Sequence, residues 1–171
     1  SALVLRAVDY RDADRIVTLL TRERGVVSVL GRGARKASKR FPGGVPAMSV
    51  LEAEIALGRG EVGRLAEAYP RRSFPSVLAA LGRIEAAGAA LELLRRLLPP
   101  RQPEPEVYDD AVALLAHLEV APPEGARALA VAFRARAAAL VGLEPSLDRC
   151  GGCGRPPPAG RATLFAPAAG A

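Results

Sequence analysis

The sequence predicts an α+β fold, in which a five-stranded β-barrel of the OB type precedes an α-helical domain. Two observations support this prediction. Residues 3–69 contain short segments in which apolar and polar residues alternate, whereas from Val77 onward the apolar residues recur at three- and four-residue steps. Because the composition changes near residues 71–75, we expect an OB-type barrel at residues 1–75 and a helical domain at residues 76–146.

Three strands are expected before the first long loop. Residues 3–8 alternate, with Leu3, Leu5 and Ala7 on one side, as is typical of a strand. A polar turn leads into residues 16–21, which are rich in β-branched side chains, and a further turn leads into a third strand at residues 26–30.

Two more strands are expected after a segment rich in proline and glycine. Residues 50–57 show the clearest alternation, with Leu51, Ala53 and Ile55 on the apolar face. Residues 62–69 form the fifth expected strand, although their alanine and glutamate also suit a helix. Five short strands with a long loop between the third and the fourth fit an OB barrel, and an SH3-like barrel or an open meander satisfies the same pattern.

Three helices are expected in the second half of the chain. The apolar period predicts an amphipathic helix from Pro75 to Leu98, with Ser73 as its N-cap. Proline pairs interrupt the pattern, so the second helix is expected at residues 106–119 and the third at residues 125–141.

The positive charge of the chain is concentrated in the predicted barrel. Residues 1–72 hold 14 Lys and Arg against 8 Asp and Glu, whereas residues 73–171 hold 10 of each. Residues 31–41, which we call the basic arm, contain two glycines and no acid. The five cations of the arm are Arg32, Arg35, Lys36, Lys39 and Arg40. Such a segment gains most from a partner with regularly spaced negative charge, so the arm is either a nucleic-acid-binding segment or a solvated loop between strands.

The scarcity of aromatic residues predicts the mode of binding. Residues 1–72 contain only Tyr10, Phe41 and Tyr69, so few platforms are available for stacking bases. Phosphate contacts by five arm cations would give a salt slope of about −3.5 on single strands, and about a fourfold rise in salt would lower the affinity roughly a hundredfold. We therefore expect weak, salt-sensitive binding without sequence preference.

Several other classes of protein are disfavoured by the sequence. The chain has a single histidine, and its spacing supports no Ser-His-Asp triad. No glycine-rich phosphate-binding loop leads into a helix, so the sequence shows no set of catalytic residues typical of a hydrolase. Asp9, Asp12 and Asp14 are interleaved with arginines and are expected to form a solvated turn rather than a metal cluster. No apolar stretch reaches the length of a membrane span and no signal-peptide pattern is present, so we expect no membrane contact and a cytoplasmic location.

Cys150 and Cys153 form a Cys-Gly-Gly-Cys turn, which can present two thiolates to one metal ion. A structural zinc needs four ligands, and His117 is expected to be a partly buried helix residue rather than a third one. The pair is therefore expected to be half of a zinc site, an inert thiol pair or, as a further alternative, a thiol redox centre.

The segment from Asp9 to Thr21, together with Gly25 and residues 32–35, resembles the start of the bacterial recombination mediator family RecO. The run from Leu147 to Gly154 is similar to the first half of the zinc ribbon that this family inserts into its helical domain. The resemblance implies that residues 147–171 are the first half of such a ribbon, with Zn bound through its two cysteines. Members with the ribbon carry a second cysteine pair after a segment like residues 164–167, and this sequence reaches Ala171 without one, so it is either truncated there or lacks half of the site.

The resemblance also implies a function without catalysis. Such a protein binds single- and double-stranded DNA, anneals complementary strands, and works with RecR and the C-terminal tail of single-strand-binding protein to load the recombinase, in the cytoplasm at the nucleoid. The DNA contacts of the family map onto the cations of the basic arm and onto Arg11 and Arg15. A protein-interaction scaffold whose basic patch receives an acidic partner tail is the alternative from another class.

Overall fold

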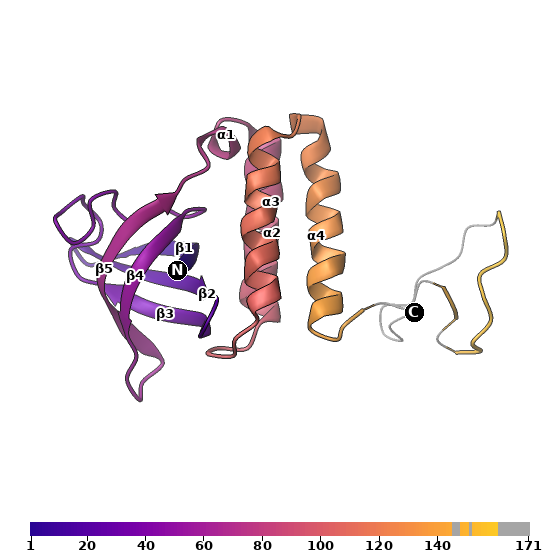
Figure 1. Cartoon of the computed structure of the whole chain (residues 1–171), viewed down its shortest axis with the longest axis horizontal. Helices are drawn as coiled ribbons and strands as arrows, with labels where there is room; N and C mark the ends of the chain where they lie inside the picture. Colours follow the sequence, from indigo (N-terminus) through magenta and orange to yellow (C-terminus); the bar gives the residue numbers. More distant parts are fainter. Residues whose placement is uncertain (145–147, 151, 161–171) are drawn as a thin grey trace.

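The computed structural model describes residues 1–144, 148–150 and 152–160. Five strands come first and four helices follow, as Figure 1 shows. The strands are β1 (Ala2–Tyr10), β2 (Asp14–Thr21), β3 (Gly25–Gly31), β4 (Val50–Ala56) and β5 (Val62–Arg72). The helices are α1 (Pro75–Leu78), α2 (Leu81–Leu97), α3 (Pro105–Val120) and α4 (Ala126–Leu140), with a 3-10 turn η1 (Pro123–Gly125) before the last.

The strands close into a barrel in the order β1-β2-β3-β5-β4. The pairing of β3 with β5 is parallel and the other pairings are antiparallel, with β4 joined to the start of β1. This closed five-stranded arrangement confirms the predicted OB-type barrel and rules out the open meander. Residues 62–69 belong to a strand, which settles the choice between strand and helix at that position.

The alternation predicted for the first strand is wrong beyond its middle. The register of β1 against β2 shifts between Val4 and Arg6, so Leu5 is an extra residue in the strand. Leu3 and Leu5 consequently pack toward the helices, whereas Val4 and Ala7 face the barrel interior. In β4 the predicted apolar face is confirmed, with Leu51 in the barrel core.

The basic arm is not a free loop, because its apolar residues fill one end of the barrel. Ala34 and Phe41 of the arm, together with Val45 four residues after it, are fully buried in the same cluster as the inward side chains of the strands. The Ala68 N–H of β5 donates to the carbonyl of Arg40 at 2.9 Å, which ties the end of the arm to the barrel wall. The arm therefore has a buried apolar side and an exposed basic side.

The first predicted helix is divided in two, and Ser73 does not cap it. The N-cap of α1 is Phe74, without a side-chain hydrogen bond, and α2 begins only at Leu81. The carboxylate of Glu119 on α3 instead accepts the N–H groups of Ser76 and Val77, each at 3.2 Å. A tertiary contact thus replaces the local cap that the sequence indicated.

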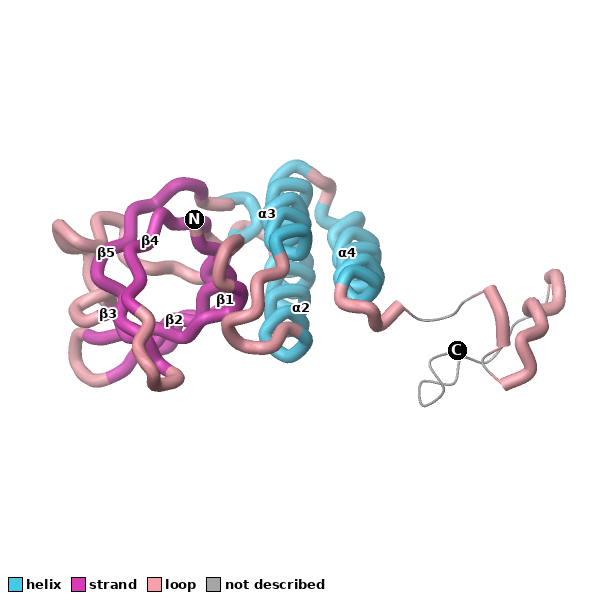
Figure 2. The backbone as a smooth tube through the Cα atoms, turned by 60° about the horizontal axis from the view of Figure 1, so that its bottom comes forward, coloured by secondary structure: helices cyan, strands magenta, loops and turns pink. Residues whose placement is uncertain are grey.

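The outer surface of the barrel and the helices share one apolar core. The face of the barrel formed by the start of β1, the end of β2 and the start of β3 packs against α2 and α3, while α4 lies on the far side of these helices (Figures 1 and 2). Polar contacts reinforce this junction. Arg22 pairs with Asp109 at 3.1 Å, and Arg101 donates to the carbonyls of Gly58 and Gly60 in the β4–β5 loop.

Within the part of the chain that the structure describes, no helix has the length and apolar character required to span a membrane.

Candidate nucleic-acid interface

The structure brings the predicted DNA-binding residues to one end of the barrel. The turn between β1 and β2 lies beside the basic arm, because the Arg35 N–H donates to the Ala13 carbonyl at 3.1 Å. The Gly33 N–H donates to the Asp14 carboxylate at 3.0 Å, and Gly33 has a φ of 74°, which suits glycine at this tight turn. Two segments separated in the sequence, each carrying predicted DNA-binding cations, therefore lie side by side at this end of the barrel.

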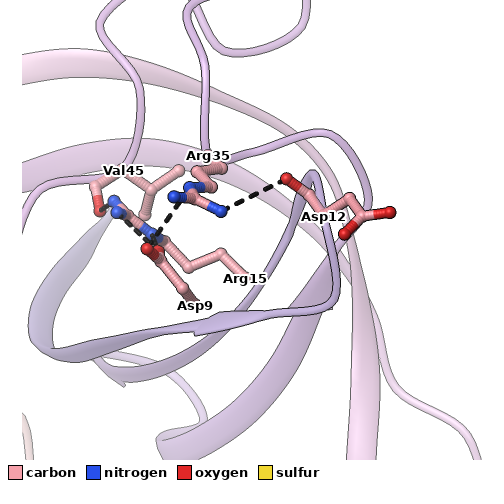
Figure 3. Close-up of polar contacts among 5 residues, drawn as sticks. All are labelled: Asp9, Asp12, Arg15, Arg35 and Val45. Carbon is pink, nitrogen blue, oxygen red and sulfur yellow. Dashed lines mark hydrogen bonds and ion pairs between the residues drawn. The ribbon is translucent and has the colours of Figure 1, made fainter.

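Arg15 and Arg35 are held by the carboxylate of Asp9, as Figure 3 shows. One oxygen of Asp9 lies 2.8 Å from Arg15 Nη2, and the other lies 3.3 Å from Arg35 Nε. Arg15 also donates to the Val45 carbonyl at 3.2 Å, and Arg35 donates to the Asp12 carbonyl at 3.4 Å. The predicted turn contains only Asp12, because Asp9 lies in β1 and Asp14 begins β2. Asp9 is exposed as expected, and its charge holds two of the seven predicted arginines and lysines.

The remaining predicted cations have no carboxylate partner within the described residues. We call these five, taken together, the basic rim: Arg11, Arg32, Lys36, Lys39 and Arg40. All five are exposed. Arg11 lies over the ring of Tyr10 at 5.2 Å, whereas Arg40 lies over the ring of Phe41 at 5.5 Å and donates to the Arg32 carbonyl. Their charges are thus available to an anionic partner at the barrel end.

The outer face of β4 and β5 has the opposite character. Glu54 lies directly opposite Glu67 across the two strands, and Glu52 follows on the same side of β4. The Tyr69 hydroxyl donates to Glu67 at 2.8 Å, and this hydrogen bond and the adjacent carboxylates raise the pKa of Tyr69. Glu52 pairs with Arg71 and with the N-terminal amine, whereas Glu54 and Glu67 have no cationic partner among the described residues. This face therefore attracts a polyanion less than the cations at the barrel end do, which leaves Tyr69 outside the candidate interface.

A row of apolar residues on the outer surface of the barrel was missed by the sequence reasoning; Val8 is exposed, and Ile16 and Leu30 are half-buried. Val8, Ile16 and Leu30 are paired side by side across β1, β2 and β3, on the outer surface of the barrel. Tyr10 follows Val8 on the same side of β1. Strict alternation places Val8 on the same side of the strand as Val4, which is an interior residue. The extra residue at Leu5 reverses the sides, so Val8 faces outward and the row could not be read from the alternation.

Cys150 and Cys153 are exposed and lie in a tight turn. The Gly154 N–H donates to the Cys150 carbonyl at 2.8 Å, and the Cys150 N–H donates to the Arg155 carbonyl at 2.8 Å. Hydrogen bonds from the backbone N–H of Cys153, the backbone N–H of Gly152 and the side chain of Cys153 lower the pKa of the Cys150 thiol. Such N–H bonds stabilise a thiolate in the form that binds metal ions.

The turn fits half of a zinc site, since it offers two neighbouring thiols. In the described ranges no group of three His, Cys, Asp or Glu side chains is arranged to hold a metal ion. His117 is exposed in the last turn of α3 rather than partly buried, which corrects the expectation from the sequence. Residues 147, 151 and 161–171 of the predicted ribbon segment lie outside the described residues, so zinc binding stays a prediction.

The lowered pKa of Cys150 has a measurable consequence. We expect iodoacetamide to alkylate Cys150 with a pH midpoint below about 8.5, the value of an ordinary thiol. Mass spectrometry of the peptide containing Cys150 after timed labelling across a pH series measures this midpoint. The same chain unfolded in urea is the control, and equal midpoints in the two states would contradict the hydrogen-bonded turn.

The closed barrel with helices packed on its outer face defines the class of the chain: an OB-fold protein with an α-helical domain. The model of the recombination protein O N-terminal domain matches residues 1–74, and that of the recombination protein O C-terminal domain matches residues 79–168. The chain therefore belongs to the RecO family.

Curated relatives agree with this assignment. The DNA repair protein RecO of Anaeromyxobacter dehalogenans (strain 2CP-C) is 43% identical over 157 residues, which cover 91% of this chain and 61% of that protein. The DNA repair protein RecO of Myxococcus xanthus (strain DK1622) is 38% identical over 156 residues, covering 91% of this chain and 63% of that protein. The chain thus spans about three fifths of the length of the curated relatives it matches.

Proposed function

We propose that this chain acts in DNA repair as a recombination mediator that binds single- and double-stranded DNA without sequence preference. The observation that supports this proposal most directly is the basic rim, which gathers five unpaired cations from two segments at one end of an OB-type barrel. The relatives of the chain are named as DNA repair proteins. Its role is binding and positioning rather than catalysis.

The basic rim suits contacts to phosphates. Arg32, Lys36 and Lys39 project from a segment whose backbone is fixed by the burial of Ala34 and Phe41, so binding does not have to order the segment. Phosphate contacts carry no sequence information and weaken steeply with salt. A protein that binds in this way brings two strands together and releases them once they have paired.

The finer steps of the proposal follow from membership of the RecO family. The protein anneals complementary strands and, with RecR and the C-terminal tail of single-strand-binding protein, helps to load the recombinase onto covered single strands. Cys150 and Cys153 supply two of the four ligands of a structural zinc, which fixes the turn between them.

Strand annealing is the experiment that tests the proposed function. We expect the protein to accelerate annealing of complementary oligonucleotides at low salt, because the basic rim neutralises both strands, and the acceleration to fade as salt rises. The rate is followed by the quenching of a fluorophore on one strand by a quencher on the other. An annealing rate equal to that without protein, combined with tight binding of an acidic peptide and none of bare DNA, would favour the interaction scaffold instead.

A further inference from the structure

One carboxylate stands among the cations at the barrel end that carries the basic rim. Asp9 of β1 is paired with Arg15 of β2, and its side chain lies between those of Arg15 and Arg35 (Figure 3). Arg35 belongs to the basic arm and precedes Lys36 of the basic rim. Two of the predicted DNA-binding cations are therefore engaged by a carboxylate at the place where the others are available to a partner.

Arg15 fixes the position of this carboxylate. Oδ1 of Asp9 accepts a hydrogen bond from Nε of Arg15 at 2.9 Å and lies 2.8 Å from Nη2 of the same group. Nη1 of Arg15 donates to the Val45 carbonyl at 3.2 Å. Each nitrogen of this guanidinium group thus has a partner, and the Arg15 side chain is only 23% exposed. Arg15 therefore anchors Asp9 and offers little to a second anion.

Arg35 lies on the other side of Asp9 and is more accessible. Its Nε is 3.3 Å from Oδ2 of Asp9, its Nη1 donates to the Asp12 carbonyl at 3.4 Å, and its side chain is 47% exposed. Both distances are long for charge-assisted contacts, so the contacts are readily exchanged for others. A phosphate group binds a guanidinium group through the same N–H donors as a carboxylate does. Asp9 therefore occupies a donor of Arg35 that a phosphate would otherwise take.

We propose that Asp9 limits the affinity of the interface for DNA, because its carboxylate competes with DNA phosphates for the guanidinium group of Arg35. The basic rim then contacts the strand while Arg35 stays paired with Asp9, and repulsion between carboxylate and phosphate opposes a further contact there. This inference rests on the proposed function, since it concerns how tightly a DNA-binding surface holds its ligand. A limited affinity suits a protein that has to release strands once they have paired.

Replacing Asp9 by asparagine tests this role. Asparagine keeps an acceptor for Arg15 and removes the negative charge, so Arg35 is freed for one additional phosphate. We expect the salt slope of Asp9→Asn on oligothymidylate to become steeper than that of the parent chain by about 0.7. At about 50 mM salt this corresponds to an affinity roughly eightfold higher. Fluorescence anisotropy titrations at several salt concentrations give the slope.

The variant Asp12→Asn is the matched control. Asp12 lies in the turn between β1 and β2, and it contacts Arg35 through its backbone carbonyl, while its carboxylate points away from that arginine (Figure 3). The substitution makes the same change in net charge without releasing a cation. This variant is expected to keep the parent salt slope and to gain only the small share of affinity that depends on net charge.

A double-mutant cycle shows whether Asp9 acts through Arg35. In the parent chain, Arg35→Gln is expected to leave the salt slope unchanged, because Arg35 is paired with Asp9 there. In the Asp9→Asn background the same substitution is expected to return the slope to the parent value. Thermal unfolding of each variant at the parent midpoint establishes that the fold is intact, as expected when exposed ion pairs are removed.

Equal salt slopes for Asp9→Asn and Asp12→Asn, or weaker binding by Asp9→Asn than by the parent chain, would overturn the role of Asp9. A shallower slope for Arg35→Gln alone would also overturn it, because Arg35 would then contact a phosphate in the presence of Asp9. Each of these outcomes leaves the proposed function standing. A parent chain that does not bind DNA would overturn both.

Discussion

Replacing Phe41 by alanine is expected to destabilise the protein by about 3 to 5 kcal/mol. The Phe41 side chain is fully buried where the basic arm closes the end of the barrel. Its removal leaves a cavity between the arm and the interior of the strands, which the closed sheet cannot fill by collapsing. The free energy of unfolding, obtained from urea titrations followed by circular dichroism, measures the loss.

The variant Phe41→Leu provides the matched control for this experiment. Leucine keeps an apolar side chain of reduced volume at the same position, so the loss is expected to be clearly smaller than for alanine. Alanine and leucine variants that both unfold at the urea concentration of the parent chain would show that Phe41 does not hold the arm to the barrel.

Removing two charges from the basic rim is expected to have the largest effect on DNA binding. In the variant Lys36→Gln/Lys39→Gln, two contacts to phosphate are lost, so the salt slope on single strands is expected to become shallower by about 1.4. At about 50 mM salt the same change corresponds to an affinity roughly fiftyfold lower. Neither lysine forms an ion pair with another described residue, so the fold loses no contact of that kind.

The helical domain offers a control with the same change in net charge. Arg127 and Arg134 are exposed on α4, on the far side of the helices from the barrel. The variant Arg127→Gln/Arg134→Gln is expected to keep the parent salt slope and to lose only the small share of affinity that depends on net charge. Equal losses in the two variants, or an unchanged slope in both, would show that binding is not centred on the basic rim.

Much of the architecture could be predicted from local patterns. The alternation in β4 is intact in the structure because one side of that strand faces the barrel core and the other faces water. The helix α3 begins at Pro105, one residue before the predicted start, since proline suits a first turn. The closed barrel follows from five such strands once their pairing order is known.

The features that escaped prediction depend on tertiary contacts. The extra residue in β1 has no local signal, because Leu3 and Leu5 are buried by helices that lie far along the chain. The start of α1 is likewise stabilised by Glu119, which accepts the N–H groups of Ser76 and Val77 from another helix. A hydrophobic period of 2 residues in a strand, or of 3.6 residues in a helix, indicates which face of that element is buried. It does not indicate a second face that is buried by a segment far along the chain.

The candidate interface was predictable in composition but not in arrangement. The cations of the basic arm were identified from their clustering, and the structure adds that Asp9 engages Arg15 and Arg35 while Phe41 anchors the arm. The apolar row of Val8, Ile16 and Leu30 was not predicted because Val8 changes side after the extra residue in β1. Which side chains of β1 reach the outer surface depends on the register of the strand, which a single sequence specifies only weakly.

The core shared by the barrel and the helices determines how the chain unfolds. Leu20 and Val26, on the outside of the barrel, belong to the same buried cluster as Leu94 of α2 and Leu115 of α3, so the helices share their core with the barrel, whose interior forms a second cluster. We therefore expect the two architectural units to unfold in one cooperative transition rather than one after the other. A barrel expressed without the helices would expose an apolar patch across β1, β2 and β3, and we expect it to self-associate through that patch.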